Sequence, residues 1–232
     1  MLGAAAALVL TGCLGKEEQR PFKIADAKIY VVQKYDGDIP SFTPYGFLTG
    51  SLALSDASIS YGIAPFMPGI SYSYYSYEAR AYAVSSLGLL KGTYRFTAKD
   101  NYNNTAIKDI ELDLDDSKML GQMNVNAFSY EDGVLSADVD KVTNASSYGF
   151  FLRPEFENDE DGFNEWARMQ GIGIYSTASY DDGAVFSLPV PSTTYDSYRV
   201  SVVACYSSEK GNIYLHSPEK RLRRYSDELE DL

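Results

Sequence analysis

The feature that most constrains the fold is a two-residue alternation of side chains that recurs along the chain between turn signals. It is longest over residues 71–85, where one face would carry Tyr75, Tyr77, Ala79, Ala81 and Ala83. Alternation of period two is typical of a strand, because successive side chains point to opposite sides of a sheet. We expect Tyr75 and Tyr77 to point inward with the alanines. Twenty tyrosines among 232 residues also favour strands over helix bundles, so the sequence predicts an all-β protein.

The first half of the chain repeats a pattern of strands separated by corners. Strand candidates cover residues 27–32, 48–54 and 58–64. A corner follows, in which Leu90 can anchor a strand end, Gly92 can supply the reversal and the Tyr94 hydroxyl can bond backbone across the corner. Residues 100–104 form a polar turn explained by turn chemistry. The next strands place two apolar sets on inner faces: Tyr94, Phe96 and Ala98, then Ile110, Leu112 and Leu114.

The second half follows the same pattern. Residues 125–130 and 134–139 are strand candidates joined by Asp132-Gly133, a dipeptide favoured in tight hairpins. Further candidates cover residues 145–152, 198–204, 212–216 and 220–224, with Pro218 separating the last two. Residues 188–195 are rich in proline and are predicted to be a connecting segment that leads into the next strand. From Lys220 to Leu232 we expect a short terminal helix with balanced charges, or a frayed end.

These residues carry a resemblance to known sandwich domains. The run from Leu90 to Asp100 reads L-x-G-T-Y-x-F-x-A-x-D and resembles the E–F corner and F strand of bacterial Ig-like and fibronectin type III-like domains. Residues 145–152 are similar to a fibronectin type III C strand, and residues 198–204 to an F strand. The core tryptophan of strand B is absent, and Leu135 would occupy that region.

The resemblance implies two consecutive Ig-like or fibronectin type III-like β-sandwiches. The first would span residues 22–116 and the second residues 121–225, with an insertion at residues 154–182. The charged run at residues 113–118 is the expected boundary. One large barrel is the alternative architecture. A continuous sheet built across residues 113–123 would contradict the two-sandwich prediction.

The N-terminal residues predict a targeting signal. Residues 1–10 are an uncharged apolar stretch, which is typical of the core of a secretory signal. Leu10-Thr11-Gly12-Cys13 resembles the bacterial lipobox. The resemblance implies that residues 1–12 are a signal peptide recorded from an internal start, that Cys13 is lipidated, and that residues 13–21 are a tether. The protein would then be held at the outer membrane by its lipid anchor. A disulfide between Cys13 and Cys205 is the alternative, but Cys205 in its apolar strand reads as a small buried hydrophobe.

The predicted tether carries a second targeting signal. Lys16, Glu17 and Glu18 follow the cysteine and resemble the surface-export signal of Bacteroidetes lipoproteins. This resemblance implies exposure at the cell surface. A simple solvated tether is the other interpretation of the same residues.

Composition excludes several functions. The formal net charge of −12 repels phosphate backbones, so nucleic acid is not an expected partner. One histidine, His216, and two cysteines are too few for a zinc site, and no phosphate-binding glycine motif occurs. Residues 157–162 mimic the opening of a calcium loop, but the twelfth position is Arg168, so a solvated acidic loop is the better interpretation. We therefore expect no cofactor, no metal, no catalytic residue and no enzymatic activity.

The remaining site candidates are aromatic. Trp166, the only tryptophan, could stack on a sugar ring or could anchor the insertion by burial. Tyr72, Tyr74 and Tyr82 fall on the polar face of the alternating segment and are candidates for ligand contact. The sequence thus predicts a non-enzymatic surface lipoprotein that acts as a binding or adhesion module for a glycan or a protein. A structural spacer or assembly subunit is the alternative, and a carbohydrate-active hydrolase using carboxylates at residues 159–165 is less favoured.

Overall fold

The computed structural model describes residues 21–62, 64–65, 67–68, 77–82, 86–89, 91–155, 172–176, 183–190, 197–223 and 228–232. Within these residues the regular structure is all β apart from one three-residue 3-10 helix, η1 (Asp116–Lys118). The all-β fold of stacked sheets predicted from the sequence is confirmed. The described residues include no helix that is long and apolar enough to cross a membrane.

The largest sheet has ten strands and follows the order β12-β11-β14-β15-β1-β2-β6-β5, with β16 on β14 and β17 on β16. Its strands are β1 (Ile24–Asp36), β2 (Ile39–Gly50), β5 (Met67–Pro68), β6 (Glu78–Tyr82), β11 (Ser147–Pro154), β12 (Ile172–Ser176), β14 (Ser197–Ser208), β15 (Gly211–His216), β16 (Lys220–Arg223) and β17 (Glu228–Asp231).

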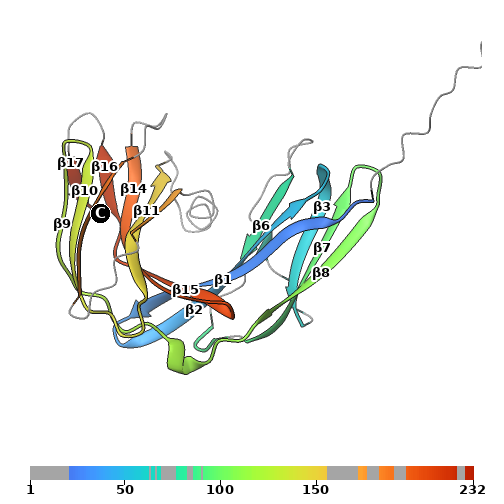
Figure 1. The fold of residues 1–232 in the computed structure, drawn as a ribbon, viewed down its shortest axis with the longest axis horizontal. Coiled ribbons are helices and arrows are strands. Elements are labelled where there is room, and N and C mark those ends of the chain that lie inside the picture. Colours follow the sequence, from blue (N-terminus) through green and yellow to red (C-terminus); the bar gives the residue numbers. More distant parts are fainter. Residues whose placement is uncertain are drawn as a thin grey trace, which may run out of the picture.

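Two smaller sheets complete the layers. One has the order β4-β3-β7-β8, and the other has the order β13-β10-β9. Their strands are β3 (Leu54–Tyr61), β4 (Ala64–Pro65), β7 (Gly92–Asp100), β8 (Thr105–Leu112), β9 (Val125–Glu131), β10 (Val134–Asp140) and β13 (Gly183–Pro189). Figure 1 shows one small sheet in each lobe of the molecule, with β1, β2 and β15 running between the lobes.

The strand face predicted at the first corner is confirmed, whereas Leu90 lies outside the described residues. Tyr94, Phe96 and Ala98 are all buried on one face of β7. Burial raises the pKa of the Tyr94 phenol. The side-chain hydroxyl that bonds to the backbone at this corner is that of Tyr61, which donates to the Lys91 carbonyl at 2.8 Å. The Tyr61 ring packs against the Tyr94 ring. Two tyrosines from facing strands therefore hold this corner.

The hairpin predicted at Asp132-Gly133 is also confirmed. It joins β9 to β10, with φ of 50° at Asp132 and 79° at Gly133. Positive φ at both central residues is the geometry that matches the twist of the flanking strands. Leu135, placed in the core from the sequence, is fully buried.

Several strand predictions are wrong in detail. Residues 51–53 are not strand, because β2 ends at Gly50 and β3 begins at Leu54. Tyr77, expected inside, is 51% exposed, whereas Ala79 is 3% exposed; Tyr77 precedes β6, so the alternation does not govern it. Strand β13 was not predicted, although Ala184 and Phe186 are buried and Val185 is exposed. Because of Pro189 and the following Pro191, the sequence predicts a connecting segment here and not a strand.

The C-terminal segment is a hairpin and not a helix. Strand β17 pairs antiparallel with β16, and the register sets Lys220 opposite Asp231 and Arg221 opposite Glu230. These pairs form ion pairs of 2.9 and 3.4 Å. The basic and acidic residues that were expected to balance along a helix therefore pair across two strands. Opposite charges at facing positions stabilise the register of such a pair.

The two halves of the chain share the ten-stranded sheet. Residues 31–33 of β1 pair in parallel with residues 213–215 of β15, so strands of both halves lie side by side. The join is not made across residues 113–123, since β8 ends at Leu112 and β9 begins at Val125. The division into sandwiches at 22–116 and 121–225 stays a prediction.

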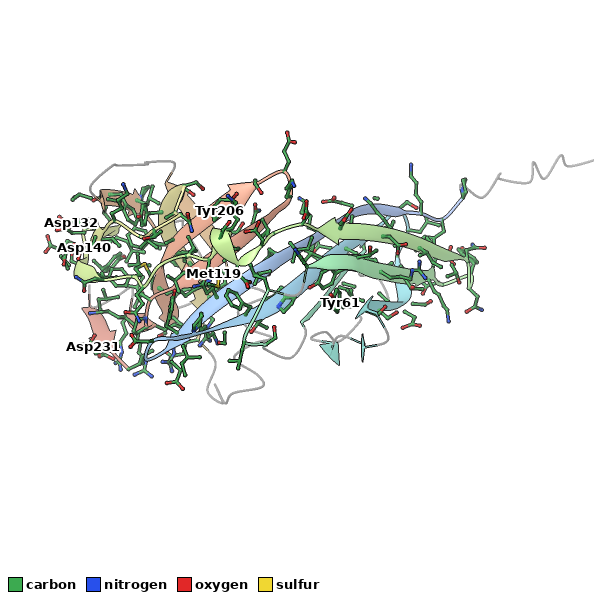
Figure 2. The ribbon with its side chains drawn as sticks, turned by 90° about the horizontal axis from the view of Figure 1, so that it is seen from below. Tyr61, Met119, Asp132, Asp140, Tyr206 and Asp231 are labelled. Atoms are coloured by element: carbon green, nitrogen blue, oxygen red, sulfur yellow. The ribbon has the colours of Figure 1, made fainter. Side chains whose placement is uncertain are left out.

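A buried glutamine fixes the connection between the halves to β1. The Gln33 amide donates to the Leu120 carbonyl at 2.7 Å and accepts from the Leu120 N–H at 2.9 Å. Tyr35 donates to the same carbonyl at 2.6 Å. Gln33 and Leu120 are fully buried, so these bonds satisfy backbone groups that water does not reach. In Figure 2, Met119 of this connection lies beside the long strands.

We expect Gln33→Leu to lower the free energy of unfolding by about 1–3 kcal/mol, because it orphans the buried Leu120 N–H. The matched control is Gln122→Leu, since Gln122 bonds Gly37 and Asp38 from an exposed position in the same connection. The control should change stability by less than about 0.5 kcal/mol. Urea denaturation measures both, and equal stability of the two variants would contradict the role assigned to Gln33.

Candidate functional site

Most residues predicted from the sequence to contact a ligand lie outside the described residues. This holds for Cys13, Tyr72, Tyr74, Trp166 and the carboxylates at residues 159–165. Tyr82 lies at the end of β6, where its backbone pairs with Tyr45 of β2 and Met67 of β5. The ligand-binding roles of these residues therefore stay predictions.

Cys205 is a free, buried thiol in β14. Burial raises its pKa to about 11, so the group is protonated at neutral pH. This confirms the interpretation of Cys205 as a small buried hydrophobe.

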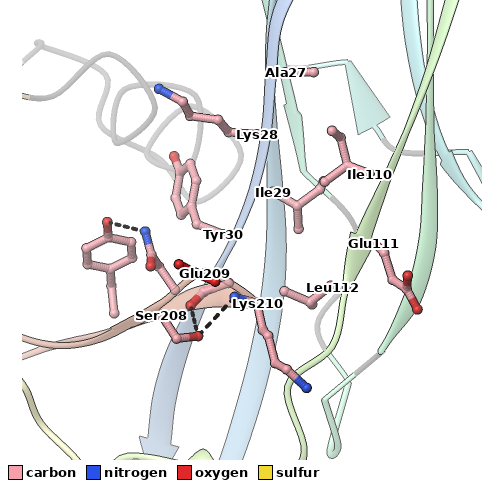
Figure 3. Close-up of a pocket in the computed structure, with 13 residues that line it drawn as sticks. Ala27, Lys28, Ile29, Tyr30, Ile110, Glu111, Leu112, Ser208, Glu209 and Lys210 are labelled. Carbon is pink, nitrogen blue, oxygen red and sulfur yellow. Dashed lines mark hydrogen bonds between the residues drawn. The ribbon is translucent and has the colours of Figure 1, made fainter.

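The described residues form a groove at the junction of the two halves (Figure 3). Its volume is about 250 Å³. The lining comes from three places: β1, the end of β8, and the turn between β14 and β15. The lining residues are Ala27, Lys28, Ile29, Tyr30, Ile110, Glu111, Leu112, Ser208, Glu209, Lys210, Gly211, Asn212 and Tyr214.

One wall of the groove is a strand edge. Strand β1 pairs along its length with β2, but on its other side β15 pairs only with residues 31–33. Within the described part of the chain, no strand pairs with residues 27–30 on that side. Alternate residues of a strand direct their N–H and C=O groups toward each edge. The groove therefore runs along a stretch of β1 that no described strand pairs with on that side.

The floor of the groove is apolar and tightly packed. Ile29 projects from β1 toward Ile110 of β8, while Lys28 and Tyr30 project from the opposite face (Figure 3). Leu112 is buried, and it lies against the turn at Gly211. Gly211 has φ of 143°, and a Cβ built there would stand 2.5 Å from Leu112 Cδ1. Glycine at this position lets the β14–β15 turn sit directly on β8.

The rim of the groove is charged and leaves two carboxylates without an ion pair. Lys28 pairs with Asp26 at 3.1 Å, and Lys210 pairs with Asp113 at 2.5 Å. The bond to Asp113 and its charge raise the pKa of Lys210. Glu111 and Glu209 are exposed, and among the described residues neither forms an ion pair. The rim therefore carries an uncompensated negative charge.

The tyrosines beside the groove are packed against one another. The Tyr30 ring stacks on Tyr45 with centroids 5.4 Å apart and planes 7° apart. Tyr214 meets Tyr30 edge to face at 5.6 Å. Tyr45 is 2% exposed, so the stacked pair is largely covered. The stacking on Tyr45 covers one face of the Tyr30 ring, so that face is not open to a sugar ring.

An arginine–glutamate network lies elsewhere in the ten-stranded sheet. Glu155 accepts from Arg199 at 2.7 Å and from Arg221 at 2.8 Å, and Ser197 adds a bond of 2.6 Å. Burial alone would raise the pKa of Glu155, but these bonds and charges outweigh it and lower the pKa. Arg153, almost fully buried, pairs with Glu219 at 2.9 Å. Both carboxylates are paired with arginine, so the network is structural.

A serine and the histidine of the chain lie in contact within the described residues. Ser201 Oγ lies 2.9 Å from His216 Nδ1. Ser201 is only 1% exposed, however, and the His216 ring packs edge-on against Phe151. A buried hydroxyl cannot meet a substrate, so this pair holds β14 to β15. The described residues also contain no group of three metal-ligating side chains.

The polar turn at residues 100–104 is structural. The Asp100 carboxylate accepts from the Tyr102 and Asn104 N–H groups at 2.9 Å and from the Asn104 amide at 2.8 Å. Burial alone would raise the pKa of Asp100, but these hydrogen bonds outweigh it and hold the pKa below its ordinary value. The carboxylate therefore stabilises the folded state in its ionised form, as turn chemistry predicts.

We expect Asp100→Asn to cost about 1–2 kcal/mol of stability at pH 7, because one acceptor becomes a donor facing the Asn104 amide. The stabilisation by Asp100 is present above the unfolded pKa of about 3.9 and is lost as the pH falls through the lower folded pKa. The difference between wild type and variant should therefore shrink below about pH 4. Urea titrations between pH 3 and 7 measure it, with Asp132→Asn as the exposed control. A difference that stays constant with pH would contradict this role of Asp100.

The groove was missed by sequence analysis because its parts are remote in the chain. Residues 27–30 were recognised as strand, and Leu112 as core, but nothing local places the turn at Lys210 beside them. One signal was available for the junction. Gln33 continues the apolar phase of Ala27, Ile29 and Val31 in β1, and a polar residue in such a phase indicates a buried partner.

Fold and groove together define an all-β protein of stacked sheets whose candidate site is a groove between its halves. No protein-family model matches the chain, and no curated protein matches it. Among solved structures, it is similar to a DUF3823 family protein from Bacteroides ovatus, with a TM-score of 0.32, 14% identity, and coverage of 85% of this chain and 99% of that chain.

Two further solved structures show comparable likeness. The titin domains Z1Z2 in complex with telethonin give a TM-score of 0.24 and 15% identity over 85% of this chain and 93% of that chain. A cytokine receptor complex gives a TM-score of 0.25 and 12% identity over 84% of this chain and 96% of that chain.

Proposed function

We propose that this chain is a non-enzymatic, lipid-anchored binding module of the outer membrane or cell surface, and that its ligand is a protein. The observation that carries the proposal is the groove at the junction, which runs along β1 on the side where no strand of the described residues pairs with residues 27–29. Unpaired strand edges are sites at which other chains add. A lipid anchor at Cys13 would hold this edge outside the bilayer.

A glycan is the other ligand class suggested by the sequence. Sugar recognition uses open aromatic faces, whereas the Tyr30 ring at this groove stacks on Tyr45 and meets Tyr214 edge to face. The charged rim and the strand edge suit a polypeptide better. This favours a protein ligand over a glycan at the groove.

The ligand class can be tested by site-specific photo-crosslinking. A benzophenone amino acid at Glu209, on the rim, is expected to capture a protein in intact cells, and the same group at exposed Glu131 is not. The purified chain should be blank on a glycan array. Glycan binding that Tyr30→Ala abolishes, or identical crosslinks from both positions, would argue against a protein ligand at this groove.

The anchor is tested by Cys13→Ser, which is expected to release the protein from the membrane fraction because no acyl chain can be attached. Cys205→Ala is the matched control and should stay in the membrane fraction, since Cys205 is a buried thiol. Fractionation and immunoblotting measure both. Persistence of Cys13→Ser in the membrane would overturn the anchor, and protease accessibility on whole cells reports surface exposure.

A further inference from the structure

Strand β17 covers one edge of β16 in the lobe that also holds β9, β10 and β14 (Figure 1). The antiparallel register sets Leu229 opposite Leu222 and Glu230 opposite Arg221. Strand β16 pairs with β14 on its other side, whereas β17 pairs with no further strand of the described residues. This four-residue strand is therefore attached to the sheet along one side only.

The contacts that hold β17 are few and largely electrostatic. Leu229 is partly buried and packs against the core. The other described side chains of β17 form ion pairs of 2.9 to 3.4 Å with basic residues of β16: Asp231–Lys220, Glu230–Arg221 and Glu230–Arg223. Exposed ion pairs contribute about 0–1 kcal/mol each and are screened by salt. Strand β17 therefore opens locally at a lower cost in free energy than global unfolding.

Opening of β17 would leave a basic strand edge behind. Among the described residues, the ion pairs of Lys220 and Arg223 are made with β17 alone. Arg221 would keep a partner, because it also pairs with Glu155 at 2.8 Å. The backbone groups of β16 on this side would lose their partners together with the two cations. Unpaired strand edges are templates for pairing with another chain, so the uncovered edge of β16 is an acceptor for a strand.

Strand β17 itself shows which chemistry fits this edge. Its Leu229 meets the core, and its Glu230 and Asp231 meet basic side chains of β16. Opposite charges at facing positions stabilise a strand pair, so an incoming strand needs the same alternation of acidic and apolar residues. A second copy of this chain would bring a formal net charge of −12 and would be repelled as a whole. A different protein is therefore the favoured source of the strand.

We infer that the edge of β16 is a second protein-binding site, which takes an extended acidic segment of another protein by strand addition, and that β17 is the built-in competitor for it. The segment would carry an apolar residue in the place of Leu229 and carboxylates that meet Lys220 and Arg223. This inference goes beyond the proposed function, because β16 pairs with the Ser197 end of β14 and the groove lies at the Ser208 end.

The test uses the full chain and a fluorescent peptide with the sequence of residues 226–232, Ser-Asp-Glu-Leu-Glu-Asp-Leu. Glu230→Lys places a cation beside Arg221 and Arg223 and should drive β17 off the edge. We expect the peptide to bind this variant about tenfold more tightly than wild type, because apparent affinity scales with the fraction of open molecules. Leu229→Ala keeps every charge but removes the apolar contact, and it should tighten binding about threefold. Fluorescence anisotropy measures both.

Two controls separate this edge from a general effect of charge. Asp36→Lys changes the net charge by the same amount as Glu230→Lys, at an exposed residue of the first half, and should bind the peptide as wild type does. The analogue peptide Ser-Asp-Lys-Leu-Lys-Asp-Leu should bind neither wild type nor Glu230→Lys. Hydrogen-exchange mass spectrometry locates the site, because the bound acidic peptide should slow exchange of the amides of residues 220–223 in Glu230→Lys.

Three results would overturn the inference. One is equal affinity of the acidic peptide for wild type, Glu230→Lys and Leu229→Ala, and another is no binding to either variant. The third is a wild-type dimer that exchanges β17 between copies, seen by sedimentation while no peptide binds, since the occupant would then be a second copy. Crosslinking from Glu209 tests the groove separately, so the inference and the proposed function can each fail alone.

Discussion

Phe150→Ala is expected to lower the free energy of unfolding by about 3–5 kcal/mol, the largest single effect we predict. Phe150 is fully buried in β11 and lies between two other rings. It stacks on Phe128 with centroids 5.6 Å apart and packs against Phe186 at 4.8 Å. Truncation would leave a cavity between two sheets and remove both ring contacts. The control Val185→Ala, at a residue 72% exposed, should change stability by less than about 0.5 kcal/mol.

The same variant tests how the two halves are coupled. One buried cluster contains both Phe150 of the second half and Phe96 of the first, and the ten-stranded sheet runs between the halves. We therefore expect Phe150→Ala and Phe96→Ala each to shift one common transition, lowering Tm by about 10 °C. Calorimetry and denaturant unfolding show the number of transitions. Two transitions, with each variant shifting only one, would instead indicate sandwiches that unfold independently.

Gly211→Ala is expected to cost about 3 kcal/mol, from backbone strain at positive φ and from crowding at Leu112 and Leu114. A Cβ at this position would stand 2.5 Å from one leucine and 3.1 Å from the other. The turn could avoid this only by moving away from β8, which would alter the groove. Gly211 therefore links the stability of the junction to the shape of the candidate site.

Gly133→Ala is the matched control for the crowding. Gly133 also has positive φ, at 79°, but a Cβ there would meet nothing within 4 Å. It should cost about 1–2 kcal/mol from strain alone. Thermal unfolding compares the stabilities of the two variants. Equal losses of stability in both variants would show that the contact with β8 contributes nothing.

Much of the local structure was readable from the chain. The alternation of Tyr94, Phe96 and Ala98 placed them correctly in the core, because a strand with one buried face must alternate. Asp132-Gly133 set a hairpin, because both positions need positive φ. Predictions failed where the alternation was extended past a strand end, as at Tyr77, and where charges compatible with a helix were satisfied across a strand pair, as in β16 and β17.

The sequence by itself determined that the chain is all β, which faces of its strands are buried, and where its tight turns lie. Only the tertiary structure decided that β1 of the first half pairs with β15 of the second, that Gln33 holds Leu120, and that a groove forms where β1, β8 and the β14–β15 turn meet. The physical reason is that side-chain patterns encode burial locally, whereas every residue but proline offers the same backbone groups to a neighbouring strand. Which edges meet depends on how remote segments pack, and the candidate site exists only at that junction.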